Sequence, residues 1–460
     1  DEWLCRSSHW LTFSLRFDNG VLDISTVKQA LERTLSHVPV LGGRVDTTAD
    51  MYQFVLDPTK KEEQQGAVLE YQQRESPPLS SLPDDTSPRS VWVNARVNGP
   101  EAGFEGAPTL NDPLLRARVI CYPKNNVSYL AVGISHGVCD GSGVCDVLQI
   151  WSHFCKQSDS NTLPEHLKRP RSFGLRVTTP QQPAANDKEL QARLKTDVGC
   201  SASPFSSWNF YTNIVPRAVY CMSFQKILEL RIDASKLHEL KKQVSLQLSK
   251  DGQWVSRFEV LMAAILVAQR ATSSNSKVLP STHALSVACN LRGRAERFSK
   301  DYFGNASFDF RQDVTLPSSP TFDTDTVTLV AQEVHRAIRT RLEDPQDICK
   351  TKDWYEAARH LGHKNEHDVW APVISDALTG RGSFLNSWEA RWLDVDMGLG
   401  NTASAMAAFF GVLQNLFIEI PRHAASGDTT LHLALTSQHH AEQFELFLKE
   451  TDTPFSVVQQ

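Results

Sequence analysis

The chain has 460 residues, and its 47 Lys and Arg against 53 Asp and Glu give a formal net charge of −6 at pH 7. This small acidic balance, without a long basic run, argues against a nucleic-acid partner. No apolar stretch reaches the roughly 20 residues that a membrane helix needs, so no membrane span is expected. The length exceeds what one hydrophobic core usually organises and therefore favours two domains.

The nine cysteines form no CxxC pair, and their odd number leaves one unpaired in any complete pairing. This usage favours reduced thiols and a cytoplasmic protein. The self-contained two-domain layout favours a monomer. The first residue is Asp1 rather than methionine, so the question of a preceding targeting segment stays open.

The first third of the chain alternates strand and helix patterns. Residues 10–17 alternate apolar and polar side chains and predict a strand, and a helical stripe then begins at Asp23 or Ser25. The polar residues 57–90 are rich in Pro, Ser and charge and indicate a surface excursion. Residues 114–122 predict the next strand.

The pattern resumes after a segment rich in Pro, Ser and Asn, and the domain boundaries follow from that segment. They give an N-terminal domain at 1–165, a crossover linker at 166–220 and a C-terminal domain at 221–460. The helix at 258–268 is apolar on nearly every side and is expected to be buried. The second half as a whole predicts strands at 225–232, 283–290, 413–420 and 430–435, and helices at 234–248, 258–268, 326–342 and 440–448.

The most informative stretch is residues 127–154, which read VSYLAVGIS-HGVCDGSG-VCDVLQIWSHF. Its first part is apolar on both faces and predicts a strand buried on two sides. Glycines then permit backbone angles that other residues resist, so His136 and Asp140 are expected on a tight turn. Ser142 can cap the helix that follows. The pair is therefore held at the mouth of a rigid element.

A histidine on such a turn can accept a proton near neutral pH, because its unperturbed pKa is about 6.5. Asp140 could hold the imidazole, or it could turn away and lock the turn through an arginine. The pair could equally be a structural contact only. One His and one Asp supply two ligands, whereas catalytic zinc usually takes three, so no metal is expected. Ser142 does not lie in a GxSxG elbow, and nothing beside Cys139 predicts a lowered pKa for its thiol.

Five short motifs occur in a fixed order between about residues 110 and 400, and together they resemble those of the BAHD acyltransferases. The resemblance is strongest to the fungal branch that includes the trichothecene O-acetyltransferases. HxxxDG alone is shared with condensation domains, so the order of all five carries the resemblance. The motifs are HGVCDG from His136, NLRGR from Asn290, YFGN from Tyr302, NSW from Asn386 and DMGLG from Asp396.

The resemblance implies an α/β (mixed α+β) fold of the chloramphenicol-acetyltransferase type. Two similar domains, each a mixed β-sheet flanked by helices, would enclose a channel. The implied activity is that of an acyl-CoA-dependent O-acyltransferase with acetyl-CoA as cosubstrate and no bound cofactor. The acceptor would be a small-molecule alcohol, a hydroxylated fungal secondary metabolite such as a trichothecene.

The resemblance also assigns roles to residues. His136 is the general base in a ternary complex, and Asp140 is a structural partner of the turn that pairs with Arg292. The acceptor and oxyanion pocket is assigned to Asn386, Ser387 and Trp388. Contacts to CoA are assigned to Ser256 and Arg294. Structural support is assigned to Gly141, Arg292, Asp396, Gly398 and Gly400.

Two departures from the family pattern and two alternatives remain. The usual DFGWG reads DMGLG here, and the threonine often found before Ser-Trp is Asn386. If the glycine motif is structural, Met397 and Leu399 should be tolerated. A condensation-type amide or ester synthase with a carrier-bound donor would use the same histidine, but it usually has a second histidine where this chain has Ser135. The other alternative is a non-catalytic binding homologue.

Overall fold

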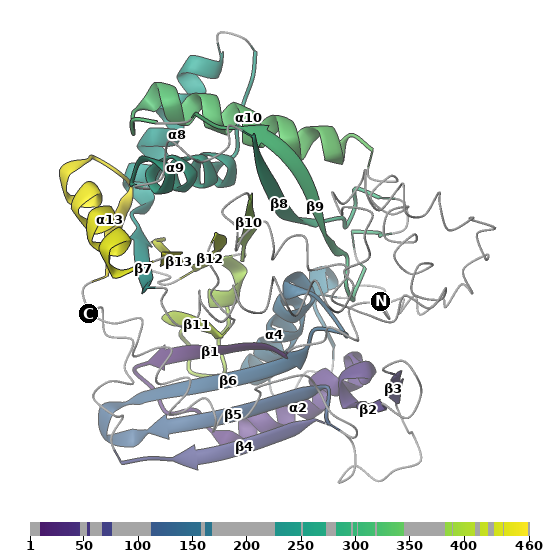
Figure 1. Cartoon of the computed structure of the whole chain (residues 1–460). Coiled ribbons are helices and arrows are strands. Elements are labelled where there is room, and N and C mark those ends of the chain that lie inside the picture. Colours follow the sequence, from purple (N-terminus) through teal and green to yellow (C-terminus); the bar gives the residue numbers. More distant parts are fainter. Residues whose placement is uncertain are drawn as a thin grey trace, which may run out of the picture.

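The computed structural model of the protein contains two large mixed β-sheets with helices packed on them (Figure 1). The described residues are 10–46, 53–55, 67–75, 112–157, 162–167, 226–249, 252–272, 282–295, 298–300, 302–317, 320–344, 382–388, 390–409, 415–421, 427–435 and 437–458.

The first sheet has the strand order β11-β1-β6-β5-β4. It is mixed because β4 runs parallel to β5 while the other neighbours run antiparallel. Two helices, α2 (Ile24–His37) and α4 (Gly141–Lys156), pack their apolar sides on one face. The strands are β1 (Trp10–Asp18), β4 (Val68–Gln73), β5 (Leu115–Tyr122), β6 (Val127–Ser135) and β11 (Ala405–Phe409), and the short β2 (Arg44–Asp46) and β3 (Gln53–Val55) pair separately.

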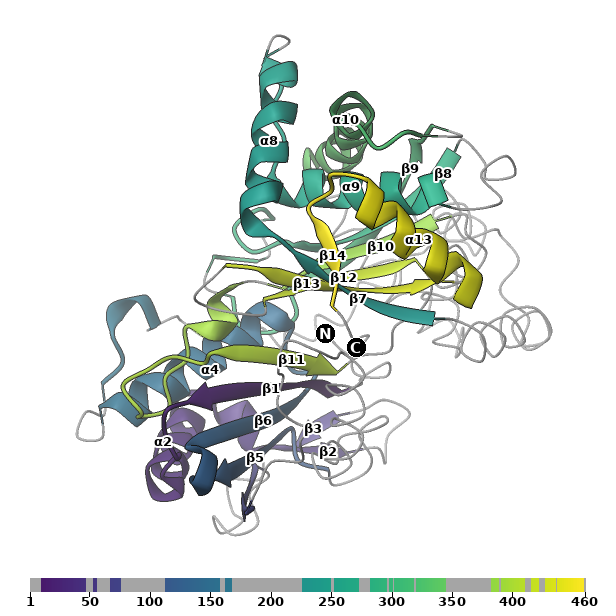
Figure 2. The ribbon, with the colours of Figure 1, turned by 90° about the vertical axis from the view of Figure 1, so that its left-hand side faces the viewer.

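The second sheet has the order β14-β7-β13-β12-β10-β8-β9 and is also mixed, since β10 runs parallel to both of its neighbours. Figure 2 shows this sheet and its helices stacked above the first sheet. The strands are β7 (Lys226–Ile232), β8 (Thr282–Asn290), β9 (Ser307–Thr315), β10 (Gly382–Ser387), β12 (Leu416–Pro421), β13 (Thr429–Leu435) and β14 (Phe455–Val457), and the helices are α8 (Ala234–Ser249), α9 (Arg257–Thr272), α10 (Thr324–Leu342) and α13 (Gln438–Glu450).

The second sheet separates two hydrophobic cores. Successive side chains of a strand point to opposite faces, and β12 shows the division. Phe417 packs with the helices α8, α9 and α10, whereas Ile418 and Ile420 pack with the core of the first sheet. The two halves of the molecule are therefore joined by direct apolar contacts between the second sheet and the first core.

Part of the late chain belongs to the first sheet. β11 pairs with β1 along its whole length, and the segment before it places Trp392, Val395 and Met397 in the first core. One strand of the predicted C-terminal domain, residues 221–460, thus completes the sheet of the first half. The domain boundaries stay a prediction, and residues 168–220 of the expected linker lie outside the described residues.

Most elements expected from apolar periodicity are present, and the buried strand and helix of residues 127–154 are confirmed as β6 and α4. The surface excursion expected at 57–90 is wrong in one part, because it contains β4. This edge strand leaves most of its side chains exposed. Its Glu70 accepts a hydrogen bond from Arg118 of β5, so polar residues suit a strand that is paired on one side only.

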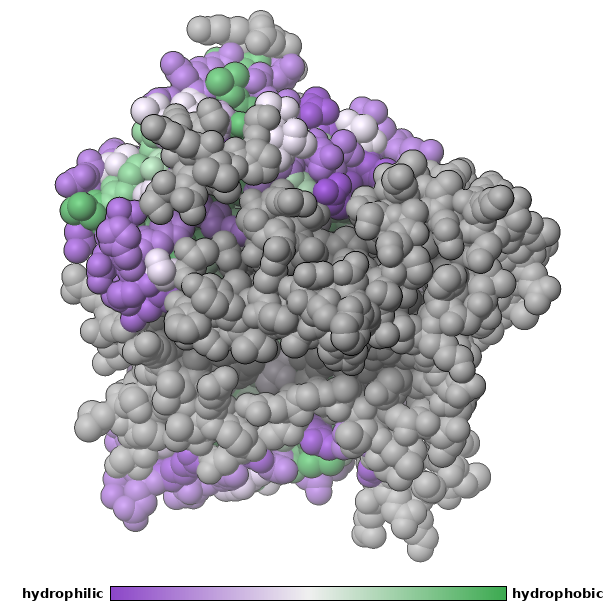
Figure 3. Space-filling model, viewed as in Figure 1, coloured by the Kyte–Doolittle hydropathy of each residue, from purple (hydrophilic) through white to green (hydrophobic). Residues whose placement is uncertain are grey.

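The outer surface of the helices over the second sheet is mainly hydrophilic, with apolar side chains scattered singly (Figure 3). Leu246, Leu329 and Leu446 are exposed on three different helices. Isolated apolar residues of this kind are normal on a protein surface. The apolar sides of the helices are directed at the sheet.

A buried histidine of the second sheet makes the stability of the folded protein depend on pH. His283 of β8 is 5% exposed, and its Nε2 lies 2.9 Å from Ser383 Oγ of β10. Burial lowers the pKa of His283 to about 3, and the positive charges of Arg270 and Arg311 act in the same direction. The folded protein therefore keeps this imidazole neutral at a pH where the unfolded chain protonates it.

We expect the free energy of unfolding to fall as the pH drops from about 6.5 toward about 3 because of His283. Its contribution is fully present above the unfolded pKa and is lost as the pH approaches the folded pKa, by up to about 1.4 kcal/mol per pH unit. Urea unfolding between pH 7 and pH 4 should show a weaker pH dependence for His283→Gln than for the native protein. The same slope in both proteins would contradict the assignment.

Candidate active site

The turn between β6 and α4 carries the candidate base. β6 ends at Ser135, and His136 follows with a half-buried side chain. Ser142 does not cap the helix as expected. Asp140 is the N-cap, with its Oδ1 accepting from Gly143 N at 3.0 Å. Ser142 lies inside the first helical turn, where its hydroxyl accepts from Asn290 Nδ2 at 3.2 Å.

The glycines of this turn do not serve for unusual backbone angles, and Gly143 is needed for space. None of Gly137, Gly141 and Gly143 has a φ in the left-handed region, so the expected reason for them is wrong. A Cβ on Gly143 would lie 2.6 Å from the Cβ of Cys139. The helix therefore starts so close to the turn that a side chain does not fit at this position.

We expect Gly143→Ala to destabilise the protein by about 1–3 kcal/mol, because the added methyl group overpacks the turn. Gly141→Ala is the matched control. Its Cβ would meet only a ring carbon of Trp392, at 3.6 Å, and alanine is the better helix former. Urea unfolding of both variants should place Gly141→Ala at or above the native stability. Equal losses in the two variants would show that the close approach to Cys139 does not matter.

A buried ion pair locks the turn from the other half of the chain. Arg292 donates from Nη1 to Asp140 Oδ2 at 2.8 Å and from Nη2 to Oδ1 at 2.9 Å, and the two side chains are 6% and 4% exposed. Burial acts to lower the pKa of Arg292, but the Asp140 carboxylate outweighs it and the pKa is raised. The guanidinium also donates to the carbonyls of Tyr302 and Gly304 at 2.8 and 2.6 Å.

The segment before β9 closes around the same turn. Ala306 N donates to Asp140 Oδ2 at 2.9 Å. The Nδ2 of Asn305 donates to the carbonyl oxygens of His136 and Gly137 at 2.8 and 3.1 Å. The turn is thus held by an ion pair and by an amide, both supplied by residues between β8 and β9 of the second sheet.

These contacts limit what the turn residues can do chemically. The Asp140 carboxylate accepts from Arg292, Gly143 and Ala306, so it serves the turn and the helix start. The pKa of the Cys139 thiol is raised well above its ordinary value, chiefly by burial and also by Asp140. The thiol stays protonated at neutral pH and is not a nucleophile. His136 is the residue of this turn suited to proton transfer.

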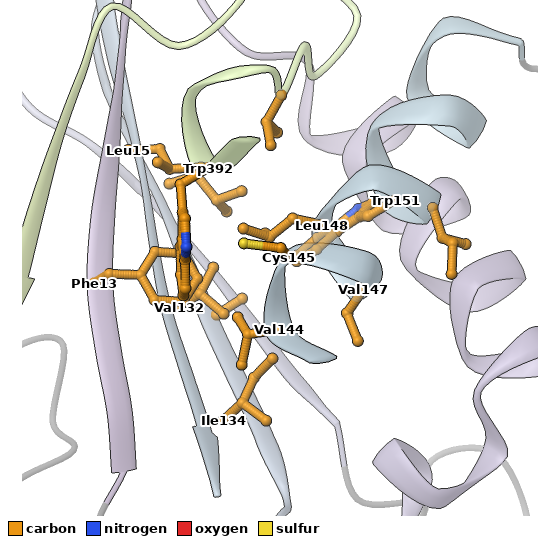
Figure 4. Packing of buried hydrophobic residues seen from close by; sticks show 14 of the residues in the cluster. Phe13, Leu15, Val132, Ile134, Val144, Cys145, Val147, Leu148, Trp151 and Trp392 are labelled. Atoms are coloured by element: carbon orange, nitrogen blue, oxygen red, sulfur yellow. The ribbon is translucent and has the colours of Figure 1, made fainter. Parts of the chain in front are cut away.

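Two stacked tryptophans join β10 to the first core. The Trp388 ring stacks on Trp392 with centroids 4.8 Å apart, and Trp392 meets Phe13 of β1 edge-on at 4.7 Å. Figure 4 shows Trp392 between side chains of the first sheet and those of α4. Trp388 is half-buried, as is Asn386 two residues earlier. The aromatic pair reaches Gly141, the first residue of α4.

Ser387 points into a different network. Its Oγ donates to Glu419 Oε2 at 2.8 Å, and the Glu419 carboxylate also accepts from Arg257 Nη1 at 2.5 Å and from Thr429 Oγ1 at 2.8 Å. Glu419 belongs to β12, and its backbone carbonyl accepts from Trp388 N. The Ser387 proton is committed to a buried carboxylate, while the network fixes the end of β10.

The two residues expected to contact CoA differ in their surroundings. Ser256 forms a capping box at the start of α9, because its Oγ accepts from Glu259 N at 3.2 Å while the Glu259 carboxylate accepts from Ser256 N at 2.5 Å. Arg294 follows β8 and is exposed. A hydroxyl already used as a cap is a weaker ligand than an exposed guanidinium.

The DMGLG segment forms a hydrogen-bonded turn that packs against the C-terminal half of α4. Oδ1 of Asp396 accepts from the backbone nitrogens of Gly398 and Gly400 at 3.0 and 3.2 Å, and both glycines have positive φ. Ser152 of α4 exchanges hydrogen bonds with the Asp396 backbone. Met397 is buried in the first core. These contacts tie the motif to α4 and to the first core, with Met397 in the place of an aromatic residue.

Sequence reasoning missed the roles of three residues in the site. Asn305 was part of a motif but had no assigned role, Trp392 was not singled out, and Glu419 gave no signal. No single periodic element predicts the stack of Trp388 on Trp392, because Trp388 directly follows β10 and Trp392 lies in a short 3-10 helix at Ala390–Leu393. Contacts across 169 residues, as between Asn305 and His136, have no local signal.

Two further observations concern metals and membranes. Within the described residues, no group of three or more His, Cys, Asp or Glu side chains is arranged to hold a metal ion. No helix of that part of the chain is long and apolar enough to cross a bilayer.

Solved structures share this fold over nearly the whole chain. TRI101 of F. sporotrichioides, complexed with Coenzyme A and T-2, has a TM-score of 0.64 at 16% identity, covering 99% of this chain and 97% of that chain. Vinorine synthase has a TM-score of 0.56 at 14% identity, covering 98% and 91%. The first condensation domain of the CDA synthetase has a TM-score of 0.55 at 13% identity, covering 98% and 92%. At such identities the likeness shows the fold alone, one of two mixed β-sheets with helices packed on them.

The sequence itself carries the assignment further. Residues 113–441 match the model of the Transferase family, the family of the BAHD enzymes. The protein therefore belongs to this family and is an acyltransferase, which confirms the resemblance expressed by the five motifs. No curated protein sequence matches the chain.

Proposed function

We propose that the protein is an acyl-CoA-dependent O-acyltransferase that transfers an acetyl group to a hydroxyl of a fungal secondary metabolite such as a trichothecene. His136 is the general base in a ternary complex of enzyme, acyl-CoA and acceptor. The structural relatives whose complexes contain Coenzyme A together with T-2 or deoxynivalenol support this choice of substrates.

The observation that carries the proposal is the way the His136 turn is held. The Asp140 carboxylate is taken up by Arg292 and two backbone nitrogens, and the neighbouring thiol is kept protonated by burial. A half-buried imidazole thus remains at the junction of the two sheets. The imidazole is then the group of this turn that can transfer a proton. The proposed mechanism needs no acyl-enzyme, because one ternary complex suffices.

The reaction would proceed in two steps. His136 accepts the proton of the acceptor hydroxyl while the oxygen attacks the thioester carbonyl carbon of acyl-CoA. The tetrahedral intermediate then collapses, the carbon–sulfur bond breaks, and the imidazolium returns the proton to the thiolate of CoA. A positioned base of this kind contributes about 10²–10⁴-fold in rate.

The neighbouring residues have proposed parts in binding. Asn386 and Trp388 are candidates to line the acceptor pocket and to donate to the oxyanion, where one well-placed donor is worth roughly 3–4 kcal/mol. Ser387 supports this pocket through Glu419. Arg294 is the better candidate for a contact to a CoA phosphate, and Ser256 is the weaker one because its hydroxyl caps α9.

The alternatives differ in the donor they use. A condensation-type synthase shares the fold and would need a carrier-bound acyl group. The position before His136 holds Ser135, which is buried at the end of β6, and not the second histidine usual in that class. A non-catalytic homologue would bind ligands without turnover.

The test is release of free thiol from acetyl-CoA in the presence of hydroxylated fungal sesquiterpenoids, with the ester product identified by mass spectrometry. Acceptor-dependent release together with an acetylated product supports the proposal. Turnover only with a carrier-bound donor points to the condensation-type reading. A protein whose melting temperature does not respond to acetyl-CoA and that releases no thiol contradicts the proposed function.

The proposal includes a monomeric protein of the cytoplasm. Buried cysteines that form no disulfide in the described part of the chain support a reducing compartment. These cysteines are Cys121, Cys139, Cys145, Cys155 and Cys289.

A further inference from the structure

One fully buried side chain, two residues before β9 of the second sheet, contacts the backbone of the candidate base. Asn305 has no exposed surface, and both hydrogens of its amide have an acceptor. Nδ2 lies 2.8 Å from the carbonyl oxygen of His136 and 3.1 Å from that of Gly137. An amide has two donors, so this side chain spends its whole donor capacity on two successive carbonyls of the turn.

The backbone around Asn305 is fixed independently. Ala306 N donates to Asp140 Oδ2 at 2.9 Å, and Ala306 O accepts from Leu291 N at 2.8 Å. The residue after Ala306 begins β9, which pairs with β8. The amide is therefore presented to the turn from a rigid sheet edge and not from a loose segment.

The side-chain amide of Asn305 has an unfavourable free energy of burial that an apolar side chain at this position would not have. Oδ1 of Asn305 is buried and has no hydrogen-bond partner within the described part of the chain. A buried acceptor without a partner is unfavourable. An apolar residue of similar size would fill the same space without this cost, but it would leave the two carbonyls of the turn without their donor.

We propose that Asn305 is a positioning residue for the reaction at His136, because its amide fixes the peptide plane that follows the Cα of His136 together with the next plane of the turn. This inference rests on the proposed function. Asn305 contacts the backbone of the base, and its own side chain is fully buried. The His136 carbonyl belongs to the peptide plane that directly follows the Cα of His136, and the Gly137 carbonyl belongs to the next plane. Rotating the first plane moves the imidazole relative to the acceptor hydroxyl, and the second contact limits that rotation. A misplacement of about 1 Å can cost about 10²-fold in rate.

The experiment compares Asn305→Ala with Asn401→Ala. Asn401 is a matched control, because its Nδ2 also donates to a backbone carbonyl of the first half, that of Asp18 at 2.6 Å, and its Oδ1 is likewise buried without a partner among the described residues. Its contact lies at the DMGLG turn, away from His136. Both variants lose a side-chain amide that joins late and early parts of the chain.

We expect Asn305→Ala to lower kcat about 10- to 100-fold while KM for acetyl-CoA changes less than about twofold. Asn401→Ala should lower the melting temperature by a similar amount and keep the native kcat. Asn305→Ser keeps one donor and should fall between Asn305→Ala and the native enzyme, which also provides a folded variant if alanine is not tolerated. A kcat for both Asn305 variants that follows their melting temperature as in Asn401→Ala would overturn the proposal.

A second readout is independent of turnover. The protein has 15 histidines, and the imidazole signals of His136 in a ¹⁵N-labelled sample are those that disappear in His136→Ala. They should shift and broaden in Asn305→Ala and stay in place in Asn401→Ala. If His136→Ala retains turnover, the part of the proposed function that makes His136 the base fails, and the positioning role of Asn305 fails with it. If His136→Ala is inactive while both Asn305 variants leave kcat and these signals unchanged, only the positioning role of Asn305 fails.

Discussion

His136→Ala is expected to lower kcat for acyl transfer by about 10²–10⁴-fold, the usual contribution of a positioned general base. The side chain is half-buried on a turn whose backbone is held from the second sheet, so its removal should leave the fold intact. The measurement is the steady-state rate of thiol release at saturating acetyl-CoA, with the melting temperature recorded for each protein.

His153→Ala provides the control for loss of an imidazole from the same region. His153 lies near the end of α4, where its Nε2 is 3.0 Å from the carbonyl oxygen of Thr162. This variant should keep a kcat close to that of the native enzyme. A His136→Ala enzyme with a kcat within about threefold of native would rule out His136 as the base.

Arg292→Ala should produce the largest loss of stability, about 3–5 kcal/mol, because it leaves the buried Asp140 carboxylate without its counter-charge. The two side chains are only 6% and 4% exposed. The variant also removes the donors to the carbonyls of Tyr302 and Gly304. Urea or thermal unfolding measures the loss, and kcat should fall as well because the turn is no longer locked.

The exposed pair of Lys236 and Asp452 is the comparison. Its atoms are 2.7 Å apart, but the side chains are 53% and 90% exposed. Solvent screens such a pair, so Lys236→Ala should cost less than about 1 kcal/mol. A loss from Arg292→Ala no larger than that from Lys236→Ala would mean that the buried pair does not hold the turn.

The elements that could be predicted from the sequence are those with a strong local pattern. The continuous apolar run before His136 and the helical spacing after it gave β6 and α4. The edge strand β4 could not be found, because its side chains are mostly exposed and follow no apolar alternation. β10 has only six residues, which is too short for periodicity to stand out.

The candidate site was predictable as a set of motifs but not as a geometry. The residues alone left two roles open for Asp140, the family resemblance assigned it to Arg292, and the structure pairs these two side chains. It could not show that Ser387 turns toward Glu419, because both residues reach the network through strand pairing that brings distant segments together. For Gly143 the residue type was informative, but the reason lay in a contact with Cys139 and not in backbone angles.

The placement of β11 beside β1 has a consequence for how the protein is made on the ribosome. The strands β1 and β6 are complete once the ribosome has added Ser135. The strand that pairs with the other edge of β1 is complete only at Phe409. At about 5–20 residues per second, the outer edge of β1 waits for about 15–55 s during translation. An unpaired edge of this kind can pair with another chain. Newly made chains should therefore depend on chaperones until the last quarter of the sequence has emerged.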